Sequence, residues 1–158
     1  MLNRRLLAAV SILALVAGCA TTRAPVSVAD TLARDPQLST LNGLVQQAGL
    51  ADMLRGAGPY TVFAPTNDAF KAVPAKTMDE LKDPVRLKAV LSYHVLPARM
   101  TTSEIKTGNV KTANGAEVGL ARAGAFVTVE DAMAQGNEVM ASNGVVYAID
   151  RVLMPPRR

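Results

Sequence analysis

The apolar positions in the first third of the chain recur at the spacing of a helix. Between residues 27 and 56, leucine and valine side chains fall three or four positions apart, which places them on one helix face. Ser27 is placed to cap the first helix, because its hydroxyl can accept a bond from a first-turn N–H group. Pro36 interrupts the pattern and Gly56 is typical of a helix end. The recurring apolar residues are Leu38, Leu41, Leu44 and Val45.

Two further helices are predicted between residues 77 and 96. Thr77 and Glu80 have the spacing of a capping box, in which the two side chains bond to each other's backbone N–H groups. Pro84 suits the first turn of the next helix, where its missing N–H group costs nothing. The apolar stripe of that second helix is made of Leu87, Val90 and Leu91.

The second half of the chain alternates short β-rich runs with turn residues. Asn114-Gly115 and Asn143-Gly144 are hairpin signals, because both residue types adopt positive φ easily. Helices first and strands later favour an α+β fold over a parallel α/β sheet. After the second turn, strand alternation places Val145, Tyr147 and Ile149 on one face and Val146, Ala148 and Asp150 on the other.

The stretch from Tyr60 to Phe70 raises a choice between structure and chemistry. It begins as a strand and stops at Pro65, after which Thr66 and Asp68 flank an asparagine. Hydroxyl, amide and carboxylate groups this close together are compatible with part of an active site. They are equally typical of a strand end followed by a helix, with Thr66 as N-cap and Asp68 near the positive end of the helix dipole. No second acid is close in sequence, so the structural interpretation is favoured.

The N-terminal segment is typical of a secretory signal. Arg4 and Arg5 precede an apolar run over residues 6–18, which is shorter than the about 20 residues that span a bilayer easily. Residues 16–19 (VAGC) resemble the lipobox of bacterial lipoproteins, in which cleavage leaves the cysteine as the lipidated first residue. Cys19 is therefore the predicted lipid attachment site, and a palmitate-bearing anchor to the membrane is expected.

Composition excludes several other kinds of site. Cys19 is the only cysteine, so neither an intrachain disulfide nor a cysteine metal cluster can form. Removing Arg4 and Arg5 with the signal lowers the formal net charge from +4 to +2, which does not favour nucleic acid as a partner. No cofactor is expected. The chain is therefore expected to have three parts. They are a signal peptide over 1–18, a lipidated N-terminus and short tether over 19–26, and one folded domain over 27–156.

His94 is the only histidine and so the natural candidate for catalysis. A hydrolase would need it to work with Ser92 or Asp68, but no nucleophile-elbow pattern accompanies it. A metal site would need further ligands, and the acids are scattered along the chain. The favoured interpretation is a partly buried histidine that holds a strand or loop by hydrogen bonds.

Three segments together resemble the fasciclin domain in order and spacing. They are residues 61–70 (TVFAPTNDAF), 93–100 (YHVLPARM) and 142–155 (SNGVVYAIDRVLMP). The resemblance implies an α+β fold, a wedge-shaped β-sandwich with flanking helices. The chain departs from the family pattern at Tyr147, where many members carry histidine, and over residues 134–140, which lack the usual aspartate.

The same resemblance implies a role for particular residues. Fasciclin domains are generally extracellular, non-enzymatic adhesion modules, and in animal members the region around the Tyr-His segment is implicated in binding. By that resemblance, Tyr93, His94 and Leu96 mark the candidate partner-binding surface. The residues expected to be structural signatures are Thr66, Asp68, Asn143 and Gly144.

The expected function is that of a bacterial envelope lipoprotein with one fasciclin domain, acting in adhesion at the cell surface. Its partners are expected to be the membrane, through the lipid anchor, and an extracellular or envelope protein or polysaccharide. Ala20 follows the cysteine, where aspartate is the usual inner-membrane retention signal of bacterial lipoproteins. The resemblance to those lipoproteins therefore implies the outer membrane where the cell has one, on its periplasmic or surface face. The alternative is a periplasmic structural or ligand-binding lipoprotein.

Overall fold

The computed structural model describes residues 26–136 and 138–156, and the predicted signal peptide and Cys19 lie outside the described residues. The first half of this region is largely helical, with one strand between the third and fourth α-helices. Ser27 caps the first helix through a bond from the Asp30 N–H group, as predicted. The helices are α1 (Val28–Arg34), η1 (Pro36–Leu38), α2 (Ser39–Gln47), α3 (Ala51–Arg55), α4 (Asn67–Lys71), α5 (Ala75–Glu80) and α6 (Pro84–Tyr93).

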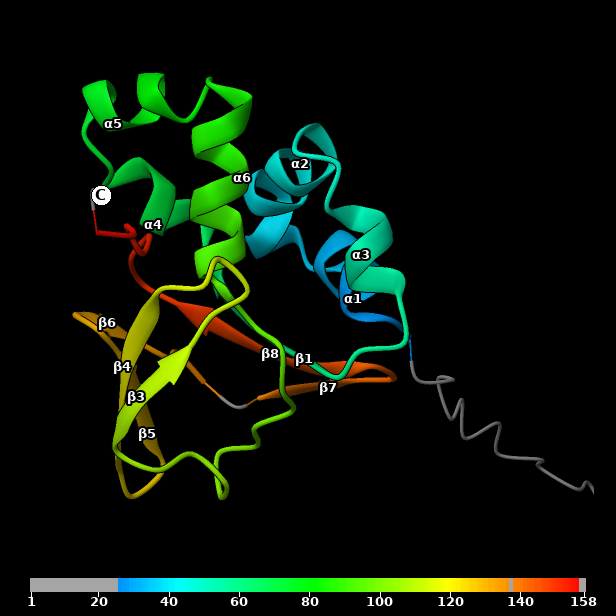
Figure 1. The fold of residues 1–158 in the computed structure, drawn as a ribbon, viewed down its shortest axis with the longest axis vertical. Coiled ribbons are helices and arrows are strands. Elements are labelled where there is room, and N and C mark those ends of the chain that lie inside the picture. Colours follow the sequence, from blue (N-terminus) through cyan, green and yellow to red (C-terminus); the bar gives the residue numbers. More distant parts are fainter. Residues whose placement is uncertain (1–25, 137, 157–158) are drawn as a thin grey trace, which may run out of the picture.

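The strands form two four-stranded sheets, which lie on one side of the molecule with the helices on the other (Figure 1). One sheet has the order β2-β1-β8-β7 and the other the order β3-β4-β5-β6. The α+β prediction is therefore confirmed. The strands are β1 (Tyr60–Pro65), β2 (Val95–Leu96), β3 (Gly108–Lys111), β4 (Glu117–Ala123), β5 (Phe126–Val129), β6 (Ala132–Met133), β7 (Val139–Ala141) and β8 (Gly144–Ile149).

Strand β8 lies inside its sheet, between β1 and β7, and both of its faces are covered. It pairs in parallel with β1, from Tyr60 opposite Gly144 to Pro65 opposite Ile149. Val146 faces the helices, where it packs with residues such as Leu32 in one buried cluster. The predicted alternation is thus confirmed at the side chains that face the second sheet, which are Val145, Tyr147 and Ile149.

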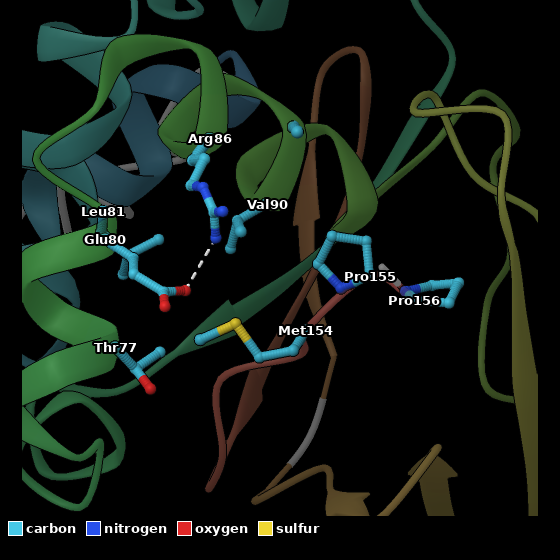
Figure 2. Close-up of a pocket in the computed structure, with 9 residues that line it drawn as sticks. Thr77, Glu80, Leu81, Arg86, Val90, Met154, Pro155 and Pro156 are labelled. Atoms are coloured by element: carbon cyan, nitrogen blue, oxygen red, sulfur yellow. Dashed lines mark hydrogen bonds and ion pairs between the residues drawn. The ribbon is translucent and has the colours of Figure 1, made fainter. Parts of the chain in front are cut away.

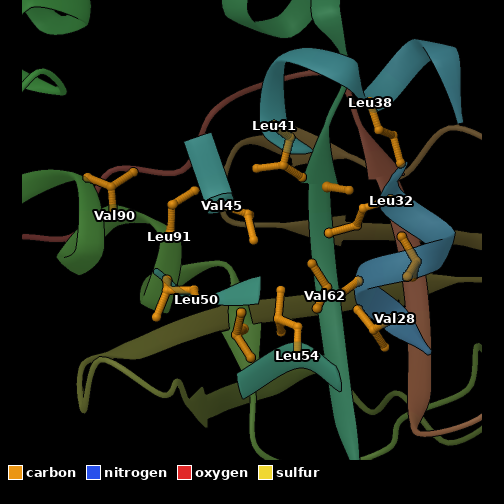
Figure 3. Packing of buried hydrophobic residues seen from close by; sticks show 14 of the residues in the cluster. Val28, Leu32, Leu38, Leu41, Val45, Leu50, Leu54, Val62, Val90 and Leu91 are labelled. Atoms are coloured by element: carbon orange, nitrogen blue, oxygen red, sulfur yellow. The ribbon is translucent and has the colours of Figure 1, made fainter. Parts of the chain in front are cut away.

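The first core cluster lies between the helices and the mixed sheet (Figure 3). Leu32, Leu54 and Leu87 come from three different helices and are almost completely buried against β1 and β8. The second cluster lies between the two sheets and includes Phe63 and Leu120. Apolar burial on both faces of the mixed sheet is the main stabilising contribution that this arrangement offers.

The predicted capping box is wrong. Thr77 lies inside α5, which begins at Ala75 after Pro74, so its side chain caps nothing. Proline terminates the preceding segment and leaves the next residue free to start the helix. Pro84 does occupy the first turn of α6, as predicted, and the cap of that helix is the carboxylate of Asp83.

Both predicted hairpins exist, but with different turns from those expected. In the turn of the β3–β4 hairpin Gly115 has positive φ but Asn114 does not, and the Thr112 N–H group bonds to the Ala116 carbonyl. In the β7–β8 hairpin Ala141 pairs with Gly144, and Gly144 is already the first strand residue. Within the described residues, no helix is long and apolar enough to cross a bilayer.

Candidate functional site

The Tyr-His segment lies where α6 ends and β2 begins. Tyr93 is the last residue of α6, and β2 then pairs antiparallel with β1. The Tyr93 hydroxyl lies 3.0 Å from the Glu117 carbonyl oxygen and 3.2 Å from Glu130 Oε1. Burial, with the nearby Glu130 carboxylate, raises the pKa of Tyr93 to about 12. The side chain therefore joins the helix end to the second sheet as a neutral hydrogen-bonding group.

His94 is held at both ring nitrogens by backbone groups. The Leu153 N–H group donates to Nε2 at 3.0 Å, so Nε2 is the acceptor and the proton sits on Nδ1. Nδ1 in turn lies 2.8 Å from the Val90 carbonyl oxygen, to which it donates. Burial lowers the pKa of His94 to about 4, because the imidazolium form would lose its water. The neutral ring thus ties the C-terminal segment 152–156 to α6.

The expectation that His94 holds a segment by hydrogen bonds is confirmed, but the ring is fully rather than partly buried. Tyr93, His94 and Leu96 have exposed fractions of 3%, 2% and 0%. These three side chains therefore do not themselves form a surface that a partner can touch, which corrects the expectation drawn from the family. Pro97 and Arg99, which directly follow them, are exposed.

The geometry does not support a hydrolytic role for His94. Both ring nitrogens are already bonded to backbone atoms, so neither faces a hydroxyl nucleophile. Asp68 lies at the start of α4 with its side chain exposed, where it pairs with Lys71 at 2.9 Å. Among the described residues, no group of three or more histidine, cysteine or acidic side chains is arranged to hold a metal ion.

The cluster at the start of α4 has a structural explanation. The Thr66 hydroxyl accepts a bond from the Ala69 N–H group at 3.3 Å, which makes it the N-cap that the sequence predicted. The asparagine between Thr66 and Asp68 has a role that the sequence did not reveal. Asn67 Oδ1 accepts from the Thr40 N–H group at 3.0 Å, and its Nδ2 donates to the Pro36 carbonyl. The cluster thus joins α4 to η1 and α2.

Asn143 links three segments that are far apart in sequence. Its Oδ1 accepts from the Val28 N–H group at 2.8 Å, across a separation of 115 residues. Its Nδ2 donates to the carbonyls of Leu54 and Gly56, both at 2.7 Å. Gly144 beside it lies so close to β1 that a Cβ atom there would fall 2.0 Å from the Tyr60 carbonyl oxygen. Both residues are therefore required by tertiary contacts more than by the turn itself.

Glu138 and Thr102 form a polar cluster that sequence reasoning missed. Glu138 Oε2 accepts from both the hydroxyl and the N–H group of Thr102, the hydroxyl at 2.6 Å. The Tyr147 hydroxyl lies 2.8 Å from the same carboxylate oxygen and 2.9 Å from the Met100 carbonyl. The Thr102 hydroxyl holds the pKa of Glu138 below its usual value. The glutamate in the segment without the family aspartate therefore fixes the loop between β2 and β3.

The family model described as "Fasciclin domain" matches residues 36–155. Protein sll1483 of Synechocystis sp. is 37% identical over 140 residues, which cover 87% of this chain and 78% of that protein. Cell surface glycolipoprotein MPT83 of Mycobacterium tuberculosis is 40% identical over 135 residues, 82% of this chain and 60% of that relative. This chain is therefore similar to a little more than half of MPT83.

A solved structure gives the same result for the fold. The FAS1 domain pair from the insect cell adhesion molecule Fasciclin I matches with a TM-score of 0.65 over 82% of this chain and 51% of that chain. Sequence identity in that match is 15%, so it bears on the fold alone. Because the family model covers most of the chain and a relative 37% identical covers 87% of it, the chain belongs to the fasciclin family.

Proposed function

We propose that this chain is a lipid-anchored, non-enzymatic binding module of the bacterial cell envelope that acts in adhesion. The observation that carries the proposal is its membership of the fasciclin family together with relatives named as cell surface glycolipoproteins. The solved structure that it resembles in fold belongs to a cell adhesion molecule. The engagement of both His94 ring nitrogens by backbone atoms further supports a binding role over a hydrolytic one.

The proposed anchor is the lipid chain on Cys19. The sequence around it supports lipidation, since small residues precede the cysteine and a basic, apolar signal precedes those. Each buried methylene contributes about 0.8 kcal/mol of membrane affinity, so several acyl chains would hold the protein permanently. We place the anchor in an outer membrane where the cell has one.

The proposed partner is a protein or polysaccharide of the matrix or of a neighbouring cell. We assign the Tyr-His segment an indirect role in this contact, because its buried side chains position the exposed residues that follow, Pro97 and Arg99. A single module of this kind binds weakly, and clustering in a membrane would supply avidity.

The alternative is a periplasmic structural or ligand-binding lipoprotein. The short tether within residues 19–26 favours this alternative, because about eight residues are only just long enough to cross a layer of lipid headgroups. Protease added to whole cells separates the two locations. Removal of the domain while periplasmic proteins survive would support the cell surface, and protection of the domain would support the periplasm.

The adhesion function is tested by the attachment of a deletion strain to surfaces. We expect the deletion to reduce attachment, the unchanged gene to restore it, and a gene carrying Cys19→Ala to fail. Normal attachment of the deletion strain would reject adhesion as the function.

A further inference from the structure

A hollow of about 470 Å³ lies between α5, α6 and the C-terminal segment (Figure 2). Its volume is within the range of small-molecule sites in proteins, which is about 300–1,000 Å³. No aromatic side chain is among its described lining residues. These are Thr77, Glu80, Leu81, Arg86, Ala89, Val90, Met154, Pro155 and Pro156.

One part of the lining is apolar. Leu81 and Val90 are buried core residues whose outer edges form the wall on the helix side. Met154 and Pro155 form the opposite wall, and Figure 2 shows the Met154 side chain extending toward α5. Met154 is 42% exposed, although methionine usually fills apolar space. The two walls together offer a site for the apolar body of a ligand.

The other part of the lining carries a positioned positive charge. Arg86 Nη1 donates to Glu80 Oε2 at 2.8 Å, and Figure 2 shows the two side chains pointing toward one another. An arginine has five N–H donors in a planar fork, and this bond occupies one of them. The carboxylate of Glu80 therefore orients the guanidinium while leaving it able to bind a second oxyanion.

We propose that this hollow binds a small amphiphilic organic acid. The carboxylate of the ligand bonds to the Arg86 guanidinium, and its apolar body lies between the Val90 and Met154 side chains. This inference does not depend on the adhesion function, because it concerns a different surface from the exposed residues that follow the Tyr-His segment.

The test is a titration of the purified full chain carrying Cys19→Ala with dodecanoate, below the concentration at which it forms micelles. Dodecanol is the matched neutral probe. Isotope-labelled methionine methyl groups report the site, and calorimetry gives the dissociation constant. We expect the Met154 methyl signal to shift saturably with dodecanoate, and dodecanol to bind at least about tenfold more weakly because it lacks the charge.

Arg86→Gln is the decisive variant and Arg151→Gln its matched control. Both arginines are about half exposed and bond to one carboxylate, Arg86 to Glu80 at 2.8 Å and Arg151 to Asp131 at 2.9 Å. We expect Arg86→Gln to raise the dissociation constant about tenfold and Arg151→Gln to leave it unchanged. Met154→Asp, which places a negative charge in the hollow at a partly exposed position, should also abolish binding.

Three results would overturn the proposal. They are an unshifted Met154 signal, equal affinity for dodecanoate and dodecanol, and equal losses in the two arginine variants. None of these results would bear on the attachment assay of the deletion strain, so failure of this proposal can be distinguished from failure of the adhesion function.

Discussion

At the scale of single residues, two contacts in this fold tolerate almost no change. Gly144 must be glycine because β1 approaches it too closely for a side chain, not because its φ is positive. His94 must stay neutral because both ring nitrogens serve backbone partners inside the core. Each contact fixes a junction between distant segments, so each leads to a measurable prediction.

Replacing Gly144 with alanine should destabilise the protein strongly. The added Cβ atom would fall 2.0 Å from the Tyr60 carbonyl oxygen and 2.9 Å from its carbon, and both are backbone atoms in a paired strand. We expect the free energy of unfolding to fall by about 3 kcal/mol in urea denaturation.

The same substitution at Gly43 is the control. Gly43 lies inside α2, where a Cβ atom would meet nothing within 4 Å. Alanine is the better helix former, so Gly43→Ala should raise the free energy of unfolding by roughly 0.5–1 kcal/mol. Equal changes in the free energy of unfolding for Gly144→Ala and Gly43→Ala would contradict the close approach of β1 to Gly144.

The stability of the protein should depend on pH through His94. Its pKa falls from an ordinary value of 6.5 to about 4 on folding, so the unfolded chain binds more protons between these values. Stability is therefore complete above pH 6.5 and is lost progressively as the pH falls toward 4. In urea unfolding between pH 6.5 and 5, we expect a slope that approaches about 1.4 kcal/mol per pH unit.

His94→Gln should remove this slope, since the chain has no other histidine. The carboxyl groups of Asp30, Glu104 and Glu138 also have pKa values below their ordinary 3.8 to 4.5, so the stability that they contribute is lost chiefly as the pH falls through and below that range. Between pH 6.5 and 5 the slope therefore comes chiefly from His94. A wild-type slope that persists in the variant would mean that another group titrates with folding.

At the scale of elements, the loop between β2 and β3 depends on contacts from elsewhere. Thr102, which lies in this loop, donates its hydroxyl to Glu138. The Thr61 hydroxyl on β1 donates to the Ala98 carbonyl at 2.6 Å and accepts from the Met100 N–H group. These polar anchors replace the ladder bonds that a longer β2 would provide. Loss of one of these anchors is therefore expected to loosen the loop.

Glu138→Ala should free this loop locally. Thr102 would lose the acceptor of its N–H group and of its hydroxyl. We expect faster hydrogen exchange at the Thr102 amide and a loss of about 1–3 kcal/mol in the free energy of unfolding. Glu104→Ala is the control, because that carboxylate bonds only locally, to Thr101. An unchanged exchange rate at Thr102 in Glu138→Ala would contradict the assignment.

Local signals predicted the elements well, and their long-range partners poorly. Capping at Ser27 and Thr66 and the alternation around Tyr147 could be recognised, because a cap or a strand face depends on neighbours in sequence. The parallel pairing of β1 with β8 and the bonds of Asn143 to Val28 join segments across most of the chain. No local pattern encodes such partners. For the same reason the burial of the Tyr-His segment was missed.

At the scale of the whole molecule, the hollow between α5 and α6 lies away from the start of the described chain. The Val26 carbonyl accepts a bond from the Ser142 N–H group, so the N-terminal end of the domain is fixed beside the β7–β8 hairpin. Figure 1 shows this hairpin and α5 at opposite sides of the molecule. A membrane anchor that precedes Val26 would therefore leave the hollow between α5 and α6 facing away from the lipid.

This orientation can be measured with spin labels on the anchored chain in lipid vesicles. Lipidation would occupy Cys19, the only natural cysteine, so a label can be placed at Ser142→Cys or at Lys76→Cys in α5, both of which are exposed positions. A paramagnetic metal chelated to the lipid headgroups should relax the label at position 142 more strongly, because the tether of about eight residues keeps the N-terminal end close to the membrane. In a chain carrying Cys19→Ala, neither label should be relaxed. Equal relaxation of the two labels in the anchored chain would mean that the domain reorients freely on its tether. The hollow would then have no preferred orientation relative to the membrane.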